Sequence, residues 1–553
     1  MTDDRPTSRV GTSLGLLVLA TVCVTVGASL VGVTRDIVSN GGNGVSDVGA
    51  LFRDPALRAA FARTLAVAVS AGLVTLTLAV PAALVIARGL GRDSGPTLLM
   101  FALPLAIPPF LTARTIGPLV QSLASAPAIR DLTAGVLEGP AFTLALIYVV
   151  HFLPLVTAAT VLSLRRADPD LEIAARSLGA GSWTIWTRTL MPLALPGVLL
   201  GTSLLAIRVI DDAASPTVLG MQDMLAPMIW RLNAAGQVQD AAPAVLLLAG
   251  LSALVVAIGW SSLRPRARGI ADLRAGRTRA VRHARWRTPA IAVATAGLAI
   301  ALLQPLSLAG LVIDDLAAQA QGSVAQVASM PFVPVFEPLV TTLSHAAMAG
   351  IALLLLSGLL APAVRAASAG GNVARALVTA LFALPAVALA AAWVEPLHAT
   401  FPASLADVSA WGALVTLAAL KGLPLGVFLV ATRSFPPSPD LRAADRTLST
   451  GRRGMQPWRA AGLRSGLCLA LFLAGAATLL VEVSAALIVL HNPHDHLGVL
   501  AWDGHLPPSD WRTAAILLLM LTLGAAALAI KAWRVSPIRA HVQARVAGRE
   551  ERT

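Results

Sequence analysis

Charged residues are scarce in this chain of 553 amino acids, in which Asp, Glu, Lys and Arg together make up only 13%. A soluble protein of this length could not cover its exterior with so few charges, which excludes a soluble globular fold. Cysteine is rarer still, with only two residues in the chain. Cys23 and Cys468 both lie in apolar runs and support neither a disulfide framework nor a thiolate metal site. The only lysines, Lys421 and Lys531, are followed by Gly and Ala, so neither fits a phosphate-binding loop. Any energy from ATP must therefore come through another polypeptide.

Hydrophobic residues supply 56% of the chain, and the mean hydropathy is +0.75. They form long runs that approach the roughly 20 residues a helix needs to cross hydrocarbon. Two of these runs are rich in proline, which transmembrane helices tolerate. The predicted fold class is all-α, a polytopic membrane protein with about twelve transmembrane helices. The predicted crossings are Gly11–Val33, Leu65–Ala87, Thr97–Leu119, Pro140–Leu164, Pro192–Asp212, Ala241–Ser262, Pro289–Ile313, Leu339–Ala361, Arg375–Leu397, Val408–Ala431, Ser465–Leu490 and Thr513–Ala532.

The first apolar run is longer than the core of a typical signal peptide and has no convincing cleavage site, so we expect a retained helix. The net charge of +13 comes from arginines beside the helix ends, the densest group being Arg264–Arg287. Positively charged loops stay cytoplasmic, and with about twelve helices all these segments fall on one side. Both termini are therefore predicted to be cytoplasmic. The partner of the chain is the lipid bilayer and not a nucleic acid. Its positive charge is interpreted as an orientation signal, and contact of the basic linker with anionic lipid headgroups is the less favoured alternative.

Short patterns recur in the same order along the two halves of the chain. Phe101-Ala-Leu-Pro104 returns as Phe382-Ala-Leu-Pro385, and Leu153-Pro154-Leu155 returns as Leu423-Pro424-Leu425. Two related bundles of about six helices explain this shared order, and such repeats commonly form a pathway between them. The predicted domains are a first half (1–262), a basic cytoplasmic linker (263–288), a second half (289–535) and a basic cytoplasmic tail (536–553).

The polar loop that follows the Pro140–Leu164 run carries the most specific pattern. Ala174, Ala175 and Leu178 favour a short helix with one apolar face. Gly179 or Gly181 can end that helix by adopting a positive φ. The sequence therefore predicts a short helix, a glycine turn and a second helix, which together project from the membrane.

Residues 170–192 resemble the EAA loop of permease subunits of ABC importers. The family pattern is Glu-Ala-Ala, three residues, Gly, nine residues, and then Ile-x-Leu-Pro. Two alanines, the glycine and the proline fall on this frame, whereas Ile173 stands where the Glu is expected, and Thr189 and Met191 replace Ile and Leu. The resemblance implies a coupling helix that docks in a groove of the ATPase subunit. The implied coupling residues are Glu172, Ala174, Ala175, Leu178, Gly179, Gly181 and Pro192.

A degenerate second copy of this loop spans residues 440–462, displaced by 270 residues. Asp440, Ala444, Leu448 and Gly451 are retained, while Gly462 stands in place of the proline. The two halves are therefore expected to couple unequally to the ATPase. An ordinary amphipathic loop helix is the alternative interpretation, and it is stronger for the second loop than for the first.

The whole layout resembles the fused two-domain permeases of ferric-iron and thiamine importers, in which one chain carries both halves. The resemblance implies a transport permease and not an enzyme, with no cofactor in this chain. It also implies two copies of an ABC ATPase that bind ATP and Mg, an external solute-binding protein, and a place in the bacterial cytoplasmic (inner) membrane. Iron or thiamine is favoured from the family alone, because polyamine, phosphonate and sulfate permeases share the same loop.

Ionisable side chains inside the predicted crossings are candidates for the translocation path. Such groups are costly in a membrane and usually face a cavity or a partner. Alternatives are an Arg–Asp pair that joins helices, or interfacial residues that reach water. His151 and Lys421 are aligned by the repeat, and a packing or snorkelling role is favoured for both. The path candidates are Arg208, Asp211, Asp212 and Glu482.

Histidines gather in an outer loop near the end of the chain, where imidazole and carboxylate together suit a transition metal. Against a metal site, Pro493 disrupts helical spacing and the first half has no equivalent histidines. A solvated loop that touches the solute-binding protein is favoured, and no metal is assigned. The weak metal candidates are His491, His494 and His496.

An ion-coupled secondary transporter with two six-helix bundles is the alternative function. Gly89-Leu-Gly-Arg-Asp93 mimics the start of a loop of the major facilitator family, but Ser94 stands where a basic residue is expected. That family also gives no reason for the loop repeated at 170 and 440. A membrane-embedded enzyme is a weaker third possibility, because no paired histidine or carboxylate constellation recurs in the apolar runs.

Overall fold

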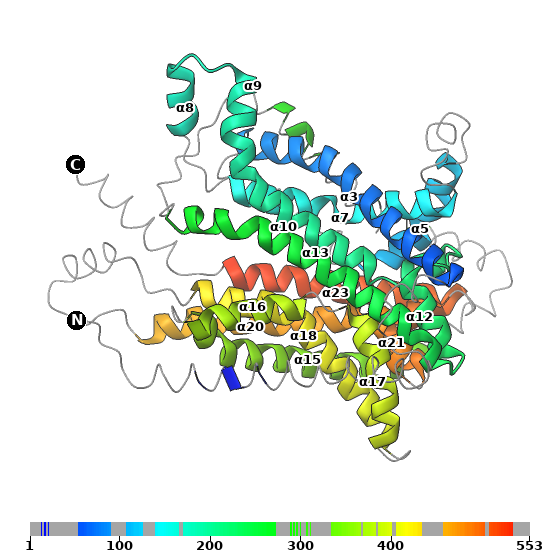
Figure 1. Ribbon diagram of the computed structural model, residues 1–553. Helices are drawn as coiled ribbons and strands as arrows, with labels where there is room; N and C mark the ends of the chain where they lie inside the picture. Colours follow the sequence, from blue (N-terminus) through cyan, green and yellow to red (C-terminus); the bar gives the residue numbers. More distant parts are fainter. Residues whose placement is uncertain are drawn as a thin grey trace.

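The computed structural model describes residues 54–89, 107–124, 139–164, 170–272, 333–365, 369–382, 385–400, 405–433, 457–490, 492–503 and 508–534, with scattered residues between 13 and 20 and between 288 and 310. Every regular element in these ranges is a helix (Figure 1). The all-α prediction is therefore confirmed for the described part of the chain.

The first half contains long apolar helices, with short helices between them. Pro140–Leu164 is the central helix, with 67% of its apolar window buried inside the protein, against 33% for the more peripheral Pro55–Arg88. The elements are α3 (Pro55–Gly89), α5 (Pro109–Ala124), α7 (Pro140–Leu164), α8 (Asp170–Ser177), α9 (Ser182–Ile185), the π-helix η3 (Trp186–Leu190), α10 (Met191–Ile210), α11 (Ala214–Val218), α12 (Leu225–Ala234) and α13 (Val238–Asp272).

The second half is built from helices of similar length and order. Its elements are α15 (Val333–Arg365), α16 (Ala369–Phe382), α17 (Ala386–Thr400), α18 (Ala406–Arg433), α20 (Pro457–Val481), α21 (Val483–Val489), the 3-10 helix η6 (Pro493–Asp495), α22 (Leu497–Trp502) and α23 (Pro508–Arg534).

Five helices in the described ranges are long and apolar enough to cross a membrane, and a bent pair would make a sixth. The pair is Leu467–Val481 and Val483–Val489, which meet at 62° beside Glu482, so the predicted crossing Ser465–Leu490 is broken. The predicted crossing Arg375–Leu397 is wrong as one helix, because it contains parts of both α16 and α17. The count of about twelve stays a prediction, since most of Gly11–Val33 and Pro289–Ile313 lies outside the described residues.

Several helix contacts of the first half have counterparts in the second half. α3 contacts α7 and α10, and α15 contacts the corresponding α18 and α20. α10 and α12 contact α13, while α20 and α22 contact α23. A hydrogen bond repeats as well: the amide of Leu225, first in α12, donates to the Thr64 hydroxyl at 3.0 Å, and the amide of Leu497, first in α22, donates to Thr342 at 2.8 Å. Each threonine thus satisfies a helix-terminal N–H group that apolar surroundings would leave unpaired.

The two halves share one continuous hydrophobic core. α13 and α12 of the first half contact α17 of the second half, and α12 also contacts α21. α8 and α9 project from one end of the bundle, which we call the α8 end (Figure 1). α12, α17 and α21 gather at the opposite end, the α12 end, so the regions discussed below lie at the two ends of the same helices.

Two glycines let α7 and α10 approach each other closely. A Cβ on Gly201 would lie 2.8 Å from Val156 Cα, and one on Gly197 would overlap the Ala159 carbonyl. We predict that Gly197→Leu lowers the stability of the protein by about 1–3 kcal/mol, because the helices must separate to admit the side chain. Thermal unfolding in detergent would measure this, with Gly250→Leu as control, since nothing lies within 4 Å of a Cβ there. Equal melting of both variants would contradict the prediction.

Candidate functional site

The turn after α8 has the hydrogen bonds of a Schellman motif. The amide of Gly179 donates to the Arg176 carbonyl at 2.9 Å, and the amide of Ala180 donates to the Ala175 carbonyl at 3.0 Å. Gly179 has a φ of +82°, the left-handed conformation that glycine adopts most readily in such a cap. Of the two glycines the sequence left open, Gly179 therefore ends the helix, and Gly181, with a φ of −67°, precedes α9.

Gly179→Val is expected to disrupt this turn, whereas Gly181→Val should leave it intact. No atom lies within 4 Å of a Cβ at either position, so the two variants differ in backbone conformation and not in available space. A β-branched residue at positive φ costs at least about 1–2 kcal/mol, enough to redirect a short exposed loop. Solute uptake and membrane level would be compared for the two variants. Normal uptake by Gly179→Val would show that the turn is not required.

A buried ion pair fastens α8 to the long helix α3. The Arg88 guanidinium near the end of α3 contacts the Glu172 carboxylate, and the two side chains are only 8% and 9% exposed. Ile185 and Leu190 of the following elements are buried in a small cluster with the ends of α3 and α7. The loop is therefore held rigidly on the bundle, and a force applied to α8 would reach α3 directly. Arg88 was not predicted, because nothing local in the sequence joins it to a residue so far along the chain.

The opposite face of the loop is apolar and exposed. Leu178 is 88% exposed and Trp183 is 75% exposed, and Leu171 and Ile173 also face away from the bundle. Exposed apolar groups clustered on a projecting element are typical of a surface that another protein covers. We call Ile173, Leu178 and Trp183 the loop surface.

The predicted coupling residues of this loop differ in whether they face solvent or the helix bundle. Ala174 lies on the exposed side, Ala175 packs against the small cluster, and Pro192 lies in the first turn of α10. Glu172 is turned inward to Arg88, away from the loop surface. Asp440, Ala444, Leu448 and Gly451 of the second loop lie outside the described residues, and the last six residues of that predicted loop form the start of α20.

A group of three charges joins the halves near the α12 end. The Lys421 ammonium on α18 lies 2.6 Å from an Asp211 carboxylate oxygen at the end of α10 and 2.5 Å from a Glu482 oxygen at the bend between α20 and α21. The side chains are 15%, 3% and 6% exposed, respectively. The other Asp211 oxygen accepts a hydrogen bond from the Val387 amide in the first turn of α17, at 3.0 Å. The predicted candidates Asp211 and Glu482 therefore meet, although they lie in different halves.

Lys421 has an electrostatic role that the sequence did not predict. A packing or snorkelling role was favoured, but its ammonium is buried between two carboxylates and does not extend to a helix end. One sequence signal was available: this lysine is one of two in the chain and stands in an apolar run. An isolated charge in such a run is expected to find a partner inside the bundle.

Asp212 and Arg208 are not part of this group of ion pairs. Asp212 accepts hydrogen bonds from the Tyr148 hydroxyl at 3.0 Å and from the amides of Ala214 and Ser215 at 2.9 and 3.1 Å, which fixes the start of α11. Arg208 is exposed on α10, and no ion pair joins it to Asp211. The alternative of an Arg–Asp pair that joins helices is therefore not seen between Arg208 and Asp211.

Further polar contacts join residues of the first half to residues of the second half. The Ala213 amide donates to the Ser484 hydroxyl at 3.1 Å, and the Trp502 indole donates to the Ala214 carbonyl at 3.0 Å. The Arg114 guanidinium donates to the Trp502 carbonyl and lies 3.9 Å from the centre of the Trp511 ring. Together with Asp211, Lys421 and Glu482, these residues form a polar boundary that we call the interhalf seam.

His494 and His496 are engaged with different partners. His494 Nε2 lies 2.7 Å from Asp503, and His496 caps α22 by accepting from the Gly498 amide at 3.1 Å while its Nε2 faces the Leu479 carbonyl at 3.2 Å. Burial lowers the pKa of His496 to about 4, so this cap stays neutral. Among the described residues no group of three potential ligands could hold a metal ion, and His491 lies outside them.

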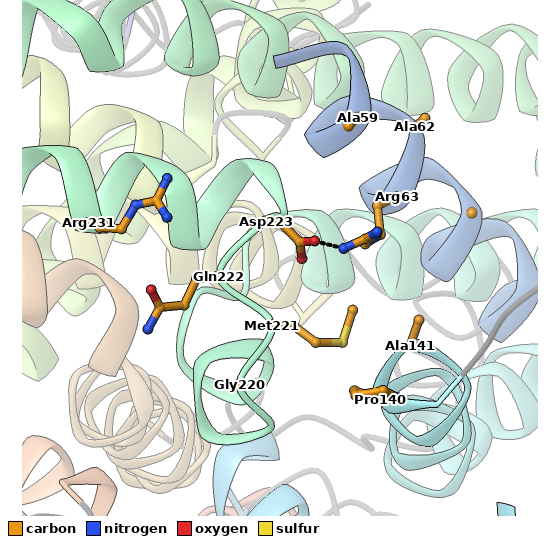
Figure 2. A pocket seen from close by; sticks show the side chains of 11 residues that line it. Ala59, Ala62, Arg63, Pro140, Ala141, Gly220, Met221, Gln222, Asp223 and Arg231 are labelled. Carbon is orange, nitrogen blue, oxygen red and sulfur yellow. Dashed lines mark ion pairs between the residues drawn. The ribbon is translucent and has the colours of Figure 1, made fainter. Parts of the chain in front are cut away.

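A pocket of about 700 Å³ opens at the α12 end of the first half. Figure 2 shows Arg63 of α3 paired with Asp223, while Arg231 of α12 and Gln222 lie apart from that pair. Gly220 lies in the turn between α11 and α12 and has a φ of +77°. The pocket is open, and its lining mixes these polar side chains with apolar ones such as Met221 and Pro140.

Residues 79–264 match the family described as "Binding-protein-dependent transport system inner membrane component". The match contains α8, its turn, the loop surface and Asp211. The resemblance of the loop to importer permeases, predicted from the sequence, and the family match therefore agree for this segment. No solved structure matches the chain.

Curated relatives cover parts of the chain. A probable molybdenum ABC transporter permease protein of Haloferax volcanii is 32% identical over 186 residues, 32% of this chain and 66% of the relative. The molybdenum transport system permease protein ModB of Mycobacterium tuberculosis is 29% identical over 230 residues, 39% of this chain and 83% of the relative. A probable ABC transporter permease protein of Sinorhizobium fredii is 40% identical over 103 residues, 18% of this chain and 17% of the relative.

Proposed function

We propose that the chain is the membrane permease of an ATP-binding-cassette importer. The observation that carries this proposal is the α8 loop, which lies in the family-matched segment, is anchored by the buried pair Arg88–Glu172, and presents an apolar surface. A rigid loop with an exposed apolar face is suited to transmit movement from a second protein.

That second protein is proposed to be an ATPase subunit in two copies, which binds ATP and Mg. Its groove would cover the loop surface, so that closure of the ATPase pair pulls on α8 and, through Glu172 and Arg88, on α3. An external solute-binding protein would deliver the solute at the α12 end, where the open pocket lies. Location in the cytoplasmic (inner) membrane with both termini in the cytoplasm belongs to the same proposal.

The chain is further proposed to hold two permease halves of about six helices each. The repeated helix contacts and the paired hydrogen bonds of Thr64 and Thr342 support this arrangement. A second loop at 440–462 would then couple to the second ATPase copy, unequally because its motif is degenerate. The seam between the halves would be the closed outer gate of the pathway.

The proposed solute is molybdenum in an anionic oxo form. Relatives from an archaeon and from mycobacteria are named for molybdenum, and none of those reported above is named for ferric iron or thiamine. These similarities do not support iron or thiamine, which the family resemblance favoured as the solute. Selection among oxyanions would rest largely with the solute-binding protein.

An ion-coupled secondary transporter is the competing function, with Asp211 and Glu482 as groups that exchange protons. In the structure both carboxylates contact the same ammonium, that of Lys421, and join the two halves as an ion-pair group. This rival also leaves the anchored α8 loop unexplained. Uptake into vesicles separates the two functions, because an importer requires ATP and the binding protein, whereas a secondary transporter stops when the ion gradient is collapsed.

The loop surface provides the sharpest mutational test of the proposal. Leu178→Glu combined with Trp183→Glu is expected to prevent ATPase binding and to reduce ATP-driven molybdate uptake at least tenfold, because charges replace the apolar contact. Gln222→Glu, an exposed residue at the α12 end, is the control for added negative charge in the measurement of ATPase binding. Unchanged ATPase binding by the double variant would overturn the assignment of this surface.

A further inference from the structure

The Asp211 carboxylate occupies a cradle whose donors all come from the other half of the protein. One oxygen lies 2.6 Å from Lys421 Nζ, and the other accepts from the Val387 amide at 3.0 Å. Val387 lies in the first turn of α17, a helix of 15 residues whose first amides have no partner within the helix. The carboxylate is thus a negatively charged ligand held by an ammonium and a helix N-terminus.

These donors are the kind that bind free oxyanions in proteins. Backbone amides at a helix start point toward an anion and carry the positive end of the helix dipole. A lysine supplies a charge with three donors, and here only two partners, Asp211 and Glu482, are found for it within the described residues. Because the Lys421 side chain keeps 15% exposure while Asp211 keeps 3%, an anion could approach the ammonium once the carboxylate has moved.

Separation of the halves would remove the Asp211 carboxylate from its donors, while Lys421 and the Val387 amide would stay together. Asp211 is carried by α10, whereas Lys421, Glu482 and Val387 all belong to the second half. In the closed seam two carboxylates outnumber one ammonium, so the local charge repels an anion. When Asp211 leaves, the ammonium and the amide remain with Glu482 alone, and the repulsion from the second carboxylate is gone.

We infer that Lys421 and the Val387 amide form a transient binding site for the anionic solute, which Asp211 fills as a tethered substitute while the seam is closed. This inference rests on the proposed function and adds to it a site within the membrane domain. Solute and Asp211 then compete for the same donors, so that an anion held at Lys421 keeps the seam from closing behind it. The adjacent Asp212 has no such role, because it is bound within its own half to Tyr148 and Ser215.

Anion binding by the purified full-length chain tests the inference. Asp211→Asn removes the competing charge, and Asp212→Asn removes an equal charge one residue away. Equilibrium dialysis with molybdate and with sulfate is expected to show at least tenfold tighter binding to Asp211→Asn than to wild type and Asp212→Asn. Adding Lys421→Gln to Asp211→Asn should abolish the gain. Equal binding by all variants, or a gain that survives Lys421→Gln, would overturn the site.

A second measurement needs no substitution in the permease chain itself, because Lys421 is one of only two lysines in that chain. In the complex with a hydrolysis-deficient ATPase and ATP, an amine-reactive reagent should modify Lys421 several times faster than in the ATP-free complex. Molybdate should protect Lys421 and leave Lys531 unaffected. Absence of protection despite increased labelling would overturn the site while leaving the importer intact. A chain that recovers no ATPase would instead overturn the proposed function.

Discussion

Lys421→Met is expected to abolish solute uptake and to lower the stability of the folded protein. The ammonium lies 2.6 Å from Asp211 and 2.5 Å from Glu482, and its removal leaves two buried carboxylates facing each other. Breaking a buried ion pair by deleting one partner costs about 3–5 kcal/mol. Thermal unfolding of the purified chain and uptake into vesicles would measure the two effects. Lys531→Met removes the other lysine and is the control.

A neutral version of the same group separates stability from transport. Lys421→Met together with Asp211→Asn and Glu482→Gln removes every charge at once, and uncharged replacements of a buried ionic group are often tolerated. We expect this triple variant to unfold close to the wild-type temperature and still to lack uptake. Restored uptake would contradict the role of the charges in transport, because packing alone would then suffice.

Arg88→Glu has the second largest expected effect, which is loss of coupling between ATP hydrolysis and transport. It places two carboxylates against each other where side chains are 8% and 9% exposed, so α8 would be pushed away from α3. Loss of one partner of a buried ion pair costs about 3–5 kcal/mol. The complex with the ATPase should hydrolyse ATP while uptake falls at least tenfold, a result that loss of folding would not produce. Arg188→Glu, an exposed arginine of the same loop, is the control.

Exchange of the two charges tests whether the pair itself is responsible. Arg88→Glu with Glu172→Arg rebuilds an ion pair in the same place, and part of the uptake should return. If the exchanged pair transports no better than Arg88→Glu alone, then Arg88 acts through some contact other than Glu172. If Arg88→Glu transports normally, the anchor is not a part of coupling.

The α8 loop could be predicted from the sequence because its determinants are local. Alanines favour a short helix, a glycine at positive φ ends it, and both signals lie within ten residues of each other along the chain. The sequence could not distinguish Gly179 from Gly181, since either can adopt the required conformation. It also could not show that Glu172 turns inward, because its partner Arg88 lies on a different helix.

The charged group at the seam was predicted only in part, for a related reason. Asp211 and Glu482 stand out as carboxylates in apolar runs, but the displacement of 270 residues aligns Glu482 with Asp212 and not with Asp211. Their meeting at Lys421 depends on how α10, α18 and the bend at α20–α21 pack together, which no local pattern encodes. The run Ser465–Leu490 contains no proline that would mark the bend, so the sequence predicts one continuous helix there.

Purification of the tagged chain from its native membranes, followed by mass spectrometry of the recovered proteins, tests the importer function most directly. We predict an ABC ATPase in two copies per chain, which is retained by Gln222→Glu and lost by the combined Leu178→Glu and Trp183→Glu variant. A stable, monodisperse chain that recovers no ATPase would contradict this function and would direct attention to Asp211 and Glu482 as ion-coupling groups.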